Sequence, residues 1–222
     1  MSISLAKQIT QLHERKPTVF VIALNAKNLL AQHQTTFEQA PYKSLPATPV
    51  IYVLPEATHN QSGRAVTIPT NHTSLRLEPH LGVVFNRQTS RVSVENALSY
   101  VSAYQPVALY SLPNNSYYRP DIEGRCQEGW CVLGQPVNVL ALSSPETVAV
   151  EINVNQQRKK AYIQPTMQHS IAELISFLSQ FIPFQAGDIL LTGTDANPVL
   201  VNQGDCVEVS FVGLGSLSNQ IN

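Results

Sequence analysis

The sequence contains little charge. Only 13% of its 222 residues are Asp, Glu, Lys or Arg, against about 25% in an average soluble domain. The formal net charge is −1, which gives no reason to expect nucleic acid or an anionic membrane as a partner. A surface this short of charge favours partial coverage by another subunit, so we expect an oligomer.

Cysteine is also scarce. The three cysteines, Cys126, Cys131 and Cys206, are odd in number, which argues against a disulfide framework. Cys126 and Cys131 lack the second pair that a zinc site requires, so we expect free structural thiols. The N-terminal residues contain no continuous apolar segment, and no apolar run is long enough to span a bilayer. We therefore expect a cytoplasmic protein.

Motifs for nucleophilic catalysis and phosphate binding are missing. There is no G-x-S-x-G sequence. The segment Gly213-Leu-Gly-Ser216 falls in a predicted hairpin, without the following helix that a phosphate loop needs. Five histidines occur in polar surroundings, where we expect surface side chains: His13, His33, His59, His72 and His169.

Short apolar segments rich in branched residues predict many strands. We expect strands over 19–24, 50–54, 75–85, 106–112, 136–141, 147–154, 158–163, 189–192 and 206–212, and a last one that ends near 221. Helices are expected over 3–14, 27–39 and 94–104, and from the capping box Ser170-Ile-Ala-Glu173 to Pro183. Strands outnumber helices and do not alternate with them regularly, which predicts a β-rich α+β domain with mixed strands.

The stretch 75–85 has a clear alternation of apolar and polar residues. In an extended strand, its apolar residues at odd positions share one face, and Arg76, Glu78 and His80 share the other. A carboxylate and an imidazole two residues apart suit a divalent metal or a proton transfer. An ordinary polar strand face has the same pattern, so both interpretations stay open. Arg119 and Arg125 are candidate binders of a substrate carboxylate.

Several stretches together resemble the fumarylacetoacetate hydrolase family. They are Phe20-Val-Ile-Ala-Leu-Asn25, Phe37-Glu-Gln-Ala-Pro-Tyr-Lys43, Tyr117-Tyr-Arg-Pro-Asp-Ile122, Arg125-Cys-Gln-Glu-Gly-Trp-Cys131, Ile189-Leu-Leu-Thr-Gly-Thr194 and Gly204-Asp-Cys-Val-Glu-Val209, with the tail Gly213-Leu-Gly-Ser-Leu-Ser-Asn219. Their order and spacing over roughly residues 19–221 make the chain similar to this family along nearly its whole length.

The resemblance implies a fold and an activity. The fold is a mixed, rolled sheet with a few peripheral helices, usually dimeric or larger, in a single domain over 1–222. In it, 1–70 form a lid and small part and 71–222 a catalytic-type core. The activity depends on Mg²⁺ or Mn²⁺, which chelates the carboxylate and oxo oxygens of a 2-oxo or 1,3-dioxo acid and stabilises an enolate.

Two functions are compatible with the resemblance. The first is a decarboxylase or isomerase of 2-oxo diacids from aromatic catabolism. The second is a non-catalytic subunit that partners a catalytic homologue, or a small-acid binding protein. A homodimer suits the first function, and a hetero-oligomer with a catalytic homologue suits the second.

The family's metal and catalytic residues are matched only in part. Its metal strand, Glu-x-Glu, corresponds to Glu78-Pro79-His80, so Glu78 and His80 are the expected metal ligands. The third ligand, an Asp, falls at Leu109. The active-site Lys falls at Arg125, which keeps the charge but cannot shuttle a proton at neutral pH. Glu78 and Arg125 are therefore the expected catalytic pair, beside a changed or absent metal site.

Other family positions also differ. The expected substrate contacts are Tyr118, Arg119, Thr192, Gly193 and Thr194, and the Thr-Gly-Thr of this set is intact. A lysine that commonly follows the second strand falls at Leu54, and the lid His-Glu pair has no evident match in Ala26-Lys-Asn-Leu-Leu30.

Overall fold

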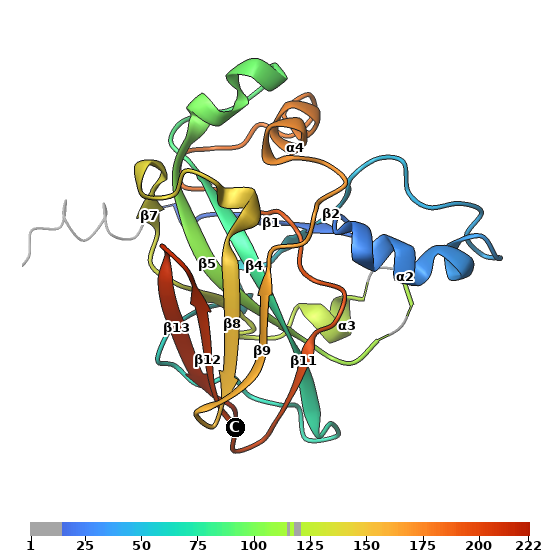
Figure 1. The fold of residues 1–222 in the computed structure, drawn as a ribbon, viewed down its shortest axis with the longest axis vertical. Helices are drawn as coiled ribbons and strands as arrows, with labels where there is room; N and C mark the ends of the chain where they lie inside the picture. The colour runs from blue at the N-terminus through green and yellow to red at the C-terminus, as the bar shows by residue number, and fades with distance from the viewer. Residues whose placement is uncertain (1–14, 115, 118–120) are drawn as a thin grey trace, which may run out of the picture.

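A computed structural model describes residues 15–114, 116–117 and 121–222 (Figure 1). The helix predicted over 3–14 lies outside the described residues, as do Tyr118 and Arg119.

Nine strands of the described part of the chain form one sheet, in the order β2-β1-β10-β4-β5-β6-β3, with β11 paired to β4 and β7 to β5. β1 runs parallel to β10, and β10 runs antiparallel to β4, so the sheet is mixed. Its strands are β1 (Val19–Ala23), β2 (Val50–Leu54), β3 (His59–Gln61), β4 (Ser74–Phe85), β5 (Val101–Ser111), β6 (Cys131–Leu133), β7 (Val137–Asn138), β10 (Ile189–Leu191) and β11 (Val199–Asn202).

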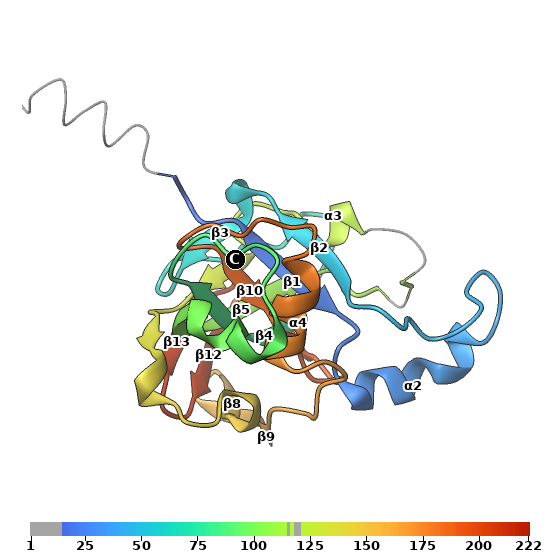
Figure 2. The same cartoon turned by 90° about the horizontal axis from the view of Figure 1, so that it is seen from above.

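A second, four-stranded sheet has the order β13-β12-β8-β9 and is antiparallel throughout. Its strands are β8 (Ala149–Val154), β9 (Gln157–Ile163), β12 (Cys206–Phe211) and β13 (Gly215–Gln220). The helices α2 (Lys27–Phe37), α3 (Ile122–Arg125) and α4 (Ile171–Leu178) lie around the sheets, α2 at the side away from the smaller sheet (Figures 1 and 2). These elements confirm the predicted β-rich α+β class.

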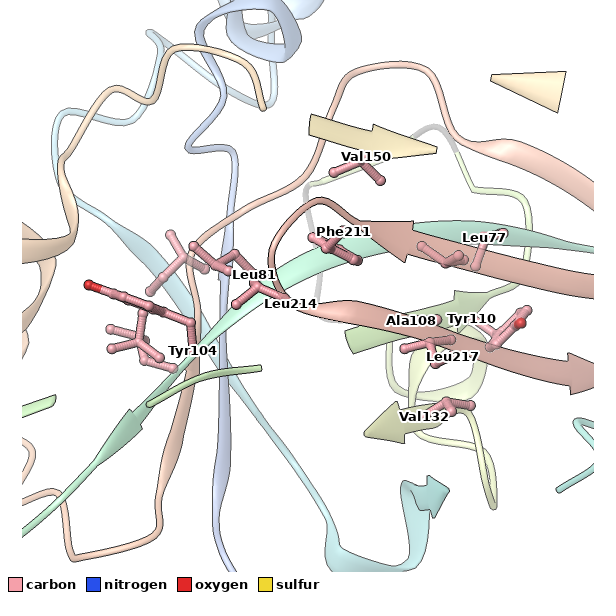
Figure 3. Packing of buried hydrophobic residues seen from close by; sticks show 14 of the residues in the cluster. Leu77, Leu81, Tyr104, Ala108, Tyr110, Val132, Val150, Phe211, Leu214 and Leu217 are labelled. Atoms are coloured by element: carbon pink, nitrogen blue, oxygen red, sulfur yellow. The ribbon is translucent and has the colours of Figure 1, made fainter. Parts of the chain in front are cut away.

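The paired strands β4 and β5 are buried on both faces in the middle of the larger sheet. On one face, Leu77 and Leu81 belong to the same core as Val150 and Phe211 of the smaller sheet (Figure 3). On the opposite face, Leu109 belongs to a second, smaller apolar cluster. Side chains from both faces of these strands are therefore shielded from water, and a polar group there needs a partner.

The helix predicted over 94–104 is wrong in type and length. The segment Val94–Tyr100 forms a 3₁₀ helix, and β5 begins at Val101. Ala103 pairs with Val84 of β4. Residues whose apolar spacing also suits a helix therefore form part of a strand. Such tertiary pairing outweighs a weak helical propensity, especially in a segment containing a β-branched valine. The short strands β3, β6 and β11 were not predicted.

None of the helices in the described ranges is long and apolar enough to cross a membrane. The predicted capping box of α4 is confirmed. The Glu173 backbone N–H donates to Ser170 Oγ at 3.3 Å, and the Ser170 backbone N–H donates to Glu173 Oε2 at 2.8 Å. Two N–H groups that the first turn leaves without helical partners are thereby satisfied.

Replacing the cap tests this assignment. We expect Ser170→Ala to lower the free energy of unfolding by about 1 kcal/mol, because the Glu173 N–H loses its acceptor. Urea denaturation followed by circular dichroism measures the change. Ser176→Ala, inside the same helix, is the matched control and should leave stability unchanged or slightly raised, since alanine is the better helix former. Equal effects of the two substitutions would contradict the capping role.

Candidate functional site

Strand β4 carries Glu78 and His80 into the smaller apolar cluster. Their side chains lie on the face opposite Leu77 and Leu81, and the two residues are only 8% and 3% exposed. In the ladder with β5, Glu78 is paired with Leu109, and His80 with Val107. The pair thus lies at a buried position and not on a solvated polar face.

Glu78 forms an ion pair with Arg125, at the end of α3. Arg125 Nη1 lies 3.0 Å from Glu78 Oε2 and also donates to the Tyr52 hydroxyl at 3.2 Å. The Ser111 hydroxyl donates to the same carboxylate oxygen at 3.4 Å. Residues of β4, β5 and α3 therefore meet at one carboxylate, and Tyr52 of β2 binds the guanidinium on its other side. The ion pair and the hydrogen bond compensate for the burial of the carboxylate.

Burial and charge fix the protonation of the groups around Glu78. Burial by itself lowers the pKa of Arg125, but the Glu78 carboxylate and Tyr52 outweigh it and raise that pKa. Burial also raises the pKa of Tyr52, although the Arg125 charge opposes the rise. Arg125 therefore stays cationic and Tyr52 stays neutral throughout the physiological pH range.

His80 is a neutral imidazole at pH 7. Burial lowers its pKa to about 4, against the opposing effect of the Glu78 charge. Its Nδ1 atom is buried and has no hydrogen-bond partner within the described ranges. A buried nitrogen of this kind is a costly feature in a folded protein, and it makes His80 a candidate contact for a bound molecule.

Three adjoining cavities surround these residues. The inner chamber, of about 30 Å³, is lined by Val21, Ile22, Ala23, Leu24, Leu29, Tyr52, Glu78, His80, Tyr117, Arg125 and Thr194. The polar arm, of about 230 Å³, is lined by Leu29, Gln32, His33, Arg76, Glu78, Asn114, Tyr117, Thr194, Asp195, Ala196, Asn197 and Pro198. The apolar arm, of about 290 Å³, is lined by Ala23, Val50, Ile51, Tyr52, Val53, Asn114, Ser116, Tyr117, Asp121, Ile122, Arg125 and Cys126.

The residues of the Thr-Gly-Thr segment occupy different positions. Thr192 is buried, and its backbone N–H and hydroxyl donate to the Leu81 carbonyl at 3.2 and 3.4 Å. Gly193 has a φ of +125°, and a Cβ there would lie 3.2 Å from the Asn25 Cβ, so the position requires glycine. Thr194 lines both the inner chamber and the polar arm. Of the predicted substrate contacts, Thr194 thus joins Glu78, His80 and Arg125 at the cavities.

Sequence reasoning missed three residues of this site. Tyr52 and Tyr117 were not singled out, and His33 was expected at the surface. His33 instead lines the polar arm, where burial and the Arg76 charge lower its pKa. The spacing of His33 along α2 gave no signal, because the arm is assembled from segments far apart in the sequence.

Residues 18–222 match the family model described as fumarylacetoacetate (FAA) hydrolase C-terminal. The chain belongs to the fumarylacetoacetate hydrolase family. This confirms the resemblance predicted from the sequence motifs, and the match covers every strand and helix described above.

Individual relatives agree with the family. The chain is 32% identical over 206 residues to a 4-hydroxyphenylacetate degradation bifunctional isomerase/decarboxylase of Salmonella dublin, covering 93% of this chain and 47% of the relative. It is 30% identical to a homoprotocatechuate catabolism bifunctional isomerase/decarboxylase of Escherichia coli, with the same coverage. The chain thus spans about half the length of these curated relatives.

Solved structures show the same fold. A fumarylpyruvate hydrolase from Pseudomonas aeruginosa, in complex with Mn²⁺ and pyruvate, superposes with a TM-score of 0.78 at 17% identity, covering 94% of this chain and 93% of that one. At this level of identity, the likeness supports the fold and not the chemistry.

The donors in the described residues do not fit a family-type Mg²⁺ or Mn²⁺ ion. Such ions take about six ligands, mainly oxygens, whereas the Glu78 carboxylate already lies against the Arg125 guanidinium. Leu109, directly across the ladder from Glu78, has no donor atom. No three His, Cys, Asp or Glu side chains of the described ranges come together as a metal-binding group.

The buried histidine predicts a pH-dependent stability. The pKa of His80 is about 4 in the folded protein and about 6.5 in an unfolded chain. The folded state therefore disfavours protonation of His80, and the free energy of unfolding decreases as the pH falls below about 6.5. The total decrease is roughly 3 kcal/mol below about pH 4.

Urea denaturation between pH 7 and pH 5 measures this effect, with His80→Asn compared with the unsubstituted chain. Between pH 6.5 and pH 5, we expect the free energy of unfolding of the unsubstituted chain to fall by about 1.5 kcal/mol more than that of His80→Asn. His72→Asn is the matched control, because His72 lies outside the cavities. An unchanged slope in His80→Asn would refute a depressed pKa at this site.

Proposed function

We propose that the chain binds 2-oxo diacids of aromatic catabolism in the cavities around Arg125 and isomerises or decarboxylates them. The family membership supports this proposal, as do the names of its curated relatives, which are bifunctional isomerase/decarboxylases of 4-hydroxyphenylacetate and homoprotocatechuate degradation. Because the chain spans about half of these relatives, their two activities need not both belong to it.

The observation that carries the proposal is the largely buried guanidinium of Arg125 beside an open cavity. Arg125 lines both the inner chamber and the apolar arm, so a ligand carboxylate or oxo group can reach it. A planar guanidinium binds carboxylates through paired hydrogen bonds, and its attraction is strengthened where water is excluded. Arg125 is thus suited to hold the 2-oxo acid group and to stabilise negative charge on an enolate oxygen.

Proton transfer is assigned to Glu78. In an enol-to-oxo isomerisation, a proton leaves the enol hydroxyl, the electron pair moves along the conjugated chain, and a carbon of that chain gains a proton. Glu78 takes the first proton and returns it, while Arg125 stays protonated throughout. The neutral His80, whose Nδ1 lacks a partner among the described residues, provides a hydrogen bond to the bound acid.

The proposed site is altered from the metal-dependent form of the family. In a metal-dependent active site, the ion supplies positive charge at the developing enolate. We propose that Arg125 supplies that charge here, since the donors around Glu78 do not suit Mg²⁺ or Mn²⁺. Thr194, at the boundary of the inner chamber and the polar arm, is the proposed additional contact to the substrate.

A non-catalytic role is the second candidate, and Leu109 is the observation in its favour. Leu109 is paired with Glu78 in the β4–β5 ladder, and the family resemblance predicts that a third metal ligand corresponds to this position. A chain of this kind would bind a small acid, or support a catalytic homologue in a hetero-oligomer. The first candidate instead goes with a homodimer in the cytoplasm. The division into a lid over 1–70 and a core over 71–222 stays a prediction.

An activity assay in the presence of a chelator separates the two candidates. The substrate is a 2-hydroxy-2,4-diene diacid, the enol form of a 2-oxo diacid, and its conversion is measured in EDTA as a decrease in its ultraviolet absorbance. We expect the purified chain to convert it, and Arg125→Met to lower kcat/KM by about 100-fold, as for loss of one group that stabilises an oxyanion. Lys159→Met, on the exposed strand β9, is the matched control and should retain full activity.

The opposite result is equally informative. If the chain alone converts nothing, and activity appears only when a catalytic homologue is added, the first candidate fails and the second is supported.

A further inference from the structure

We propose that Lys160, on strand β9 of the smaller sheet, is a positioning residue for the candidate site. Acting through Asp195, it holds Thr194 and helix α2 in place around the polar arm. The inference rests on the proposed function where it concerns turnover, because it takes Thr194 as a substrate contact. Lys160 itself does not belong to the described residues that line the three cavities.

A bulge in β9 directs Lys160 toward the interior. The ladder between β8 and β9 is irregular at Ile152, which is paired with Lys160, and the next pair involves Arg158. Lys159 is therefore the extra residue of a bulge, a feature that re-aims neighbouring side chains. Paired residues share a face, and Ile152 is buried in the larger core. The Lys160 side chain is accordingly only 21% exposed, whereas Lys159 is exposed.

Lys160 contacts the segment that follows β10. Its ammonium group donates to the Asp195 carboxylate and to the Asn197 carbonyl. Figure 1 shows β9 beside this segment, which leads into β11. Asp195 directly follows Thr194, and both residues line the polar arm. An ion pair that begins in the smaller sheet thus lies directly behind a wall of the candidate site.

Asp195 also connects this segment to α2. Its carboxylate accepts hydrogen bonds from the Asn28 side chain at 2.7 Å and from the Asn197 backbone N–H at 3.1 Å. Asn28 lies in the first turn of α2, the helix that contributes Gln32 and His33 to the polar arm. One carboxylate thereby joins β9, α2 and residues 194–198, which are far apart in the sequence.

Removal of Lys160 would leave a buried charge on Asp195. Burial by itself raises the pKa of Asp195, but the hydrogen bonds from Lys160 and the other two donors outweigh it and lower that pKa. The Asp195 side chain is only 12% exposed, so loss of its cation leaves the carboxylate uncompensated. The carboxylate would then regain water by moving away from β9, and the segment would move with it.

Thr194 lies between two fixed neighbours. On one side, Thr192 is held by its bonds to the Leu81 carbonyl and by the Asn25 side chain, which donates to the Thr192 carbonyl at 2.8 Å. On the other side, Asp195 is held by Lys160. Without Lys160, only the first anchor remains, and a small displacement of a contact residue is enough to slow a reaction.

Hydrogen exchange tests the positioning without any substrate. We expect Lys160→Met to speed amide exchange at least about fivefold in the peptides that cover 194–198 and α2, because these segments open more often once the ion pair is lost. Lys160→Arg keeps the charge and should leave exchange nearly unchanged. Lys159→Met, at the exposed neighbouring position, is the matched control and should have no effect. Thermal unfolding of each variant checks that the fold is retained.

The diene-diacid assay tests whether the positioning matters for turnover. We expect Lys160→Met to lower kcat/KM by about tenfold and Lys160→Arg to restore most of the activity. Because Lys160 acts through Thr194, its effect should largely disappear in a chain that already carries Thr194→Val, where adding Lys160→Met should cost no more than about twofold. A role in stability alone would lower the Tm and leave the two substitutions additive.

Unchanged exchange over 194–198 in Lys160→Met would overturn the inference, as would an equal effect of Lys159→Met. Full additivity of Lys160→Met and Thr194→Val in kcat/KM would overturn it as well. If the chain converts no diacid, the proposed function fails, whereas the exchange experiment still decides whether Lys160 holds the segment. The two failures are therefore distinguishable.

Discussion

The buried ion pair between Glu78 and Arg125 is the interaction on which the site depends. A carboxylate in the middle of a sheet that is buried on both faces is costly unless a cation and hydrogen bonds compensate for the loss of water. Arg125 Nη1 at 3.0 Å and the Ser111 hydroxyl at 3.4 Å provide that compensation. These contacts to the Glu78 carboxylate link α3 to β4 and β5. They also position the Arg125 guanidinium, which is the cation that we assign to substrate binding.

The fold is built on apolar cores that require no metal ion at Glu78. The two main cores are built from apolar side chains of the sheets and α4, and the larger of them lies on the other face of β4 from Glu78. Leu109 belongs to the smaller apolar cluster, so an apolar residue at this position is compatible with the packing. The chemistry of the site can change without altering the strands that carry it.

Local patterns were enough to predict much of the fold. The strand β2 follows directly from its branched apolar residues between two prolines, and α4 from its capping box, because both signals lie within a few residues. The 3₁₀ helix at Val94–Tyr100 and the early start of β5 were missed, since pairing with β4 decides them. Glu78, His80 and Arg125 were singled out from alternation and family motifs, whereas His33 and Tyr117 were not, because only the folded chain brings them to the cavities.

A double-mutant cycle of Glu78→Gln and Arg125→Met tests most directly whether Arg125, and not a divalent ion, balances the charge of Glu78. The cycle is measured by urea denaturation with and without Mn²⁺. We predict a coupling free energy of about 2 kcal/mol or more, the same in both conditions. A coupling near zero, together with stabilisation of the unsubstituted chain by Mn²⁺ that Glu78→Gln abolishes, would contradict a charge balance provided by Arg125.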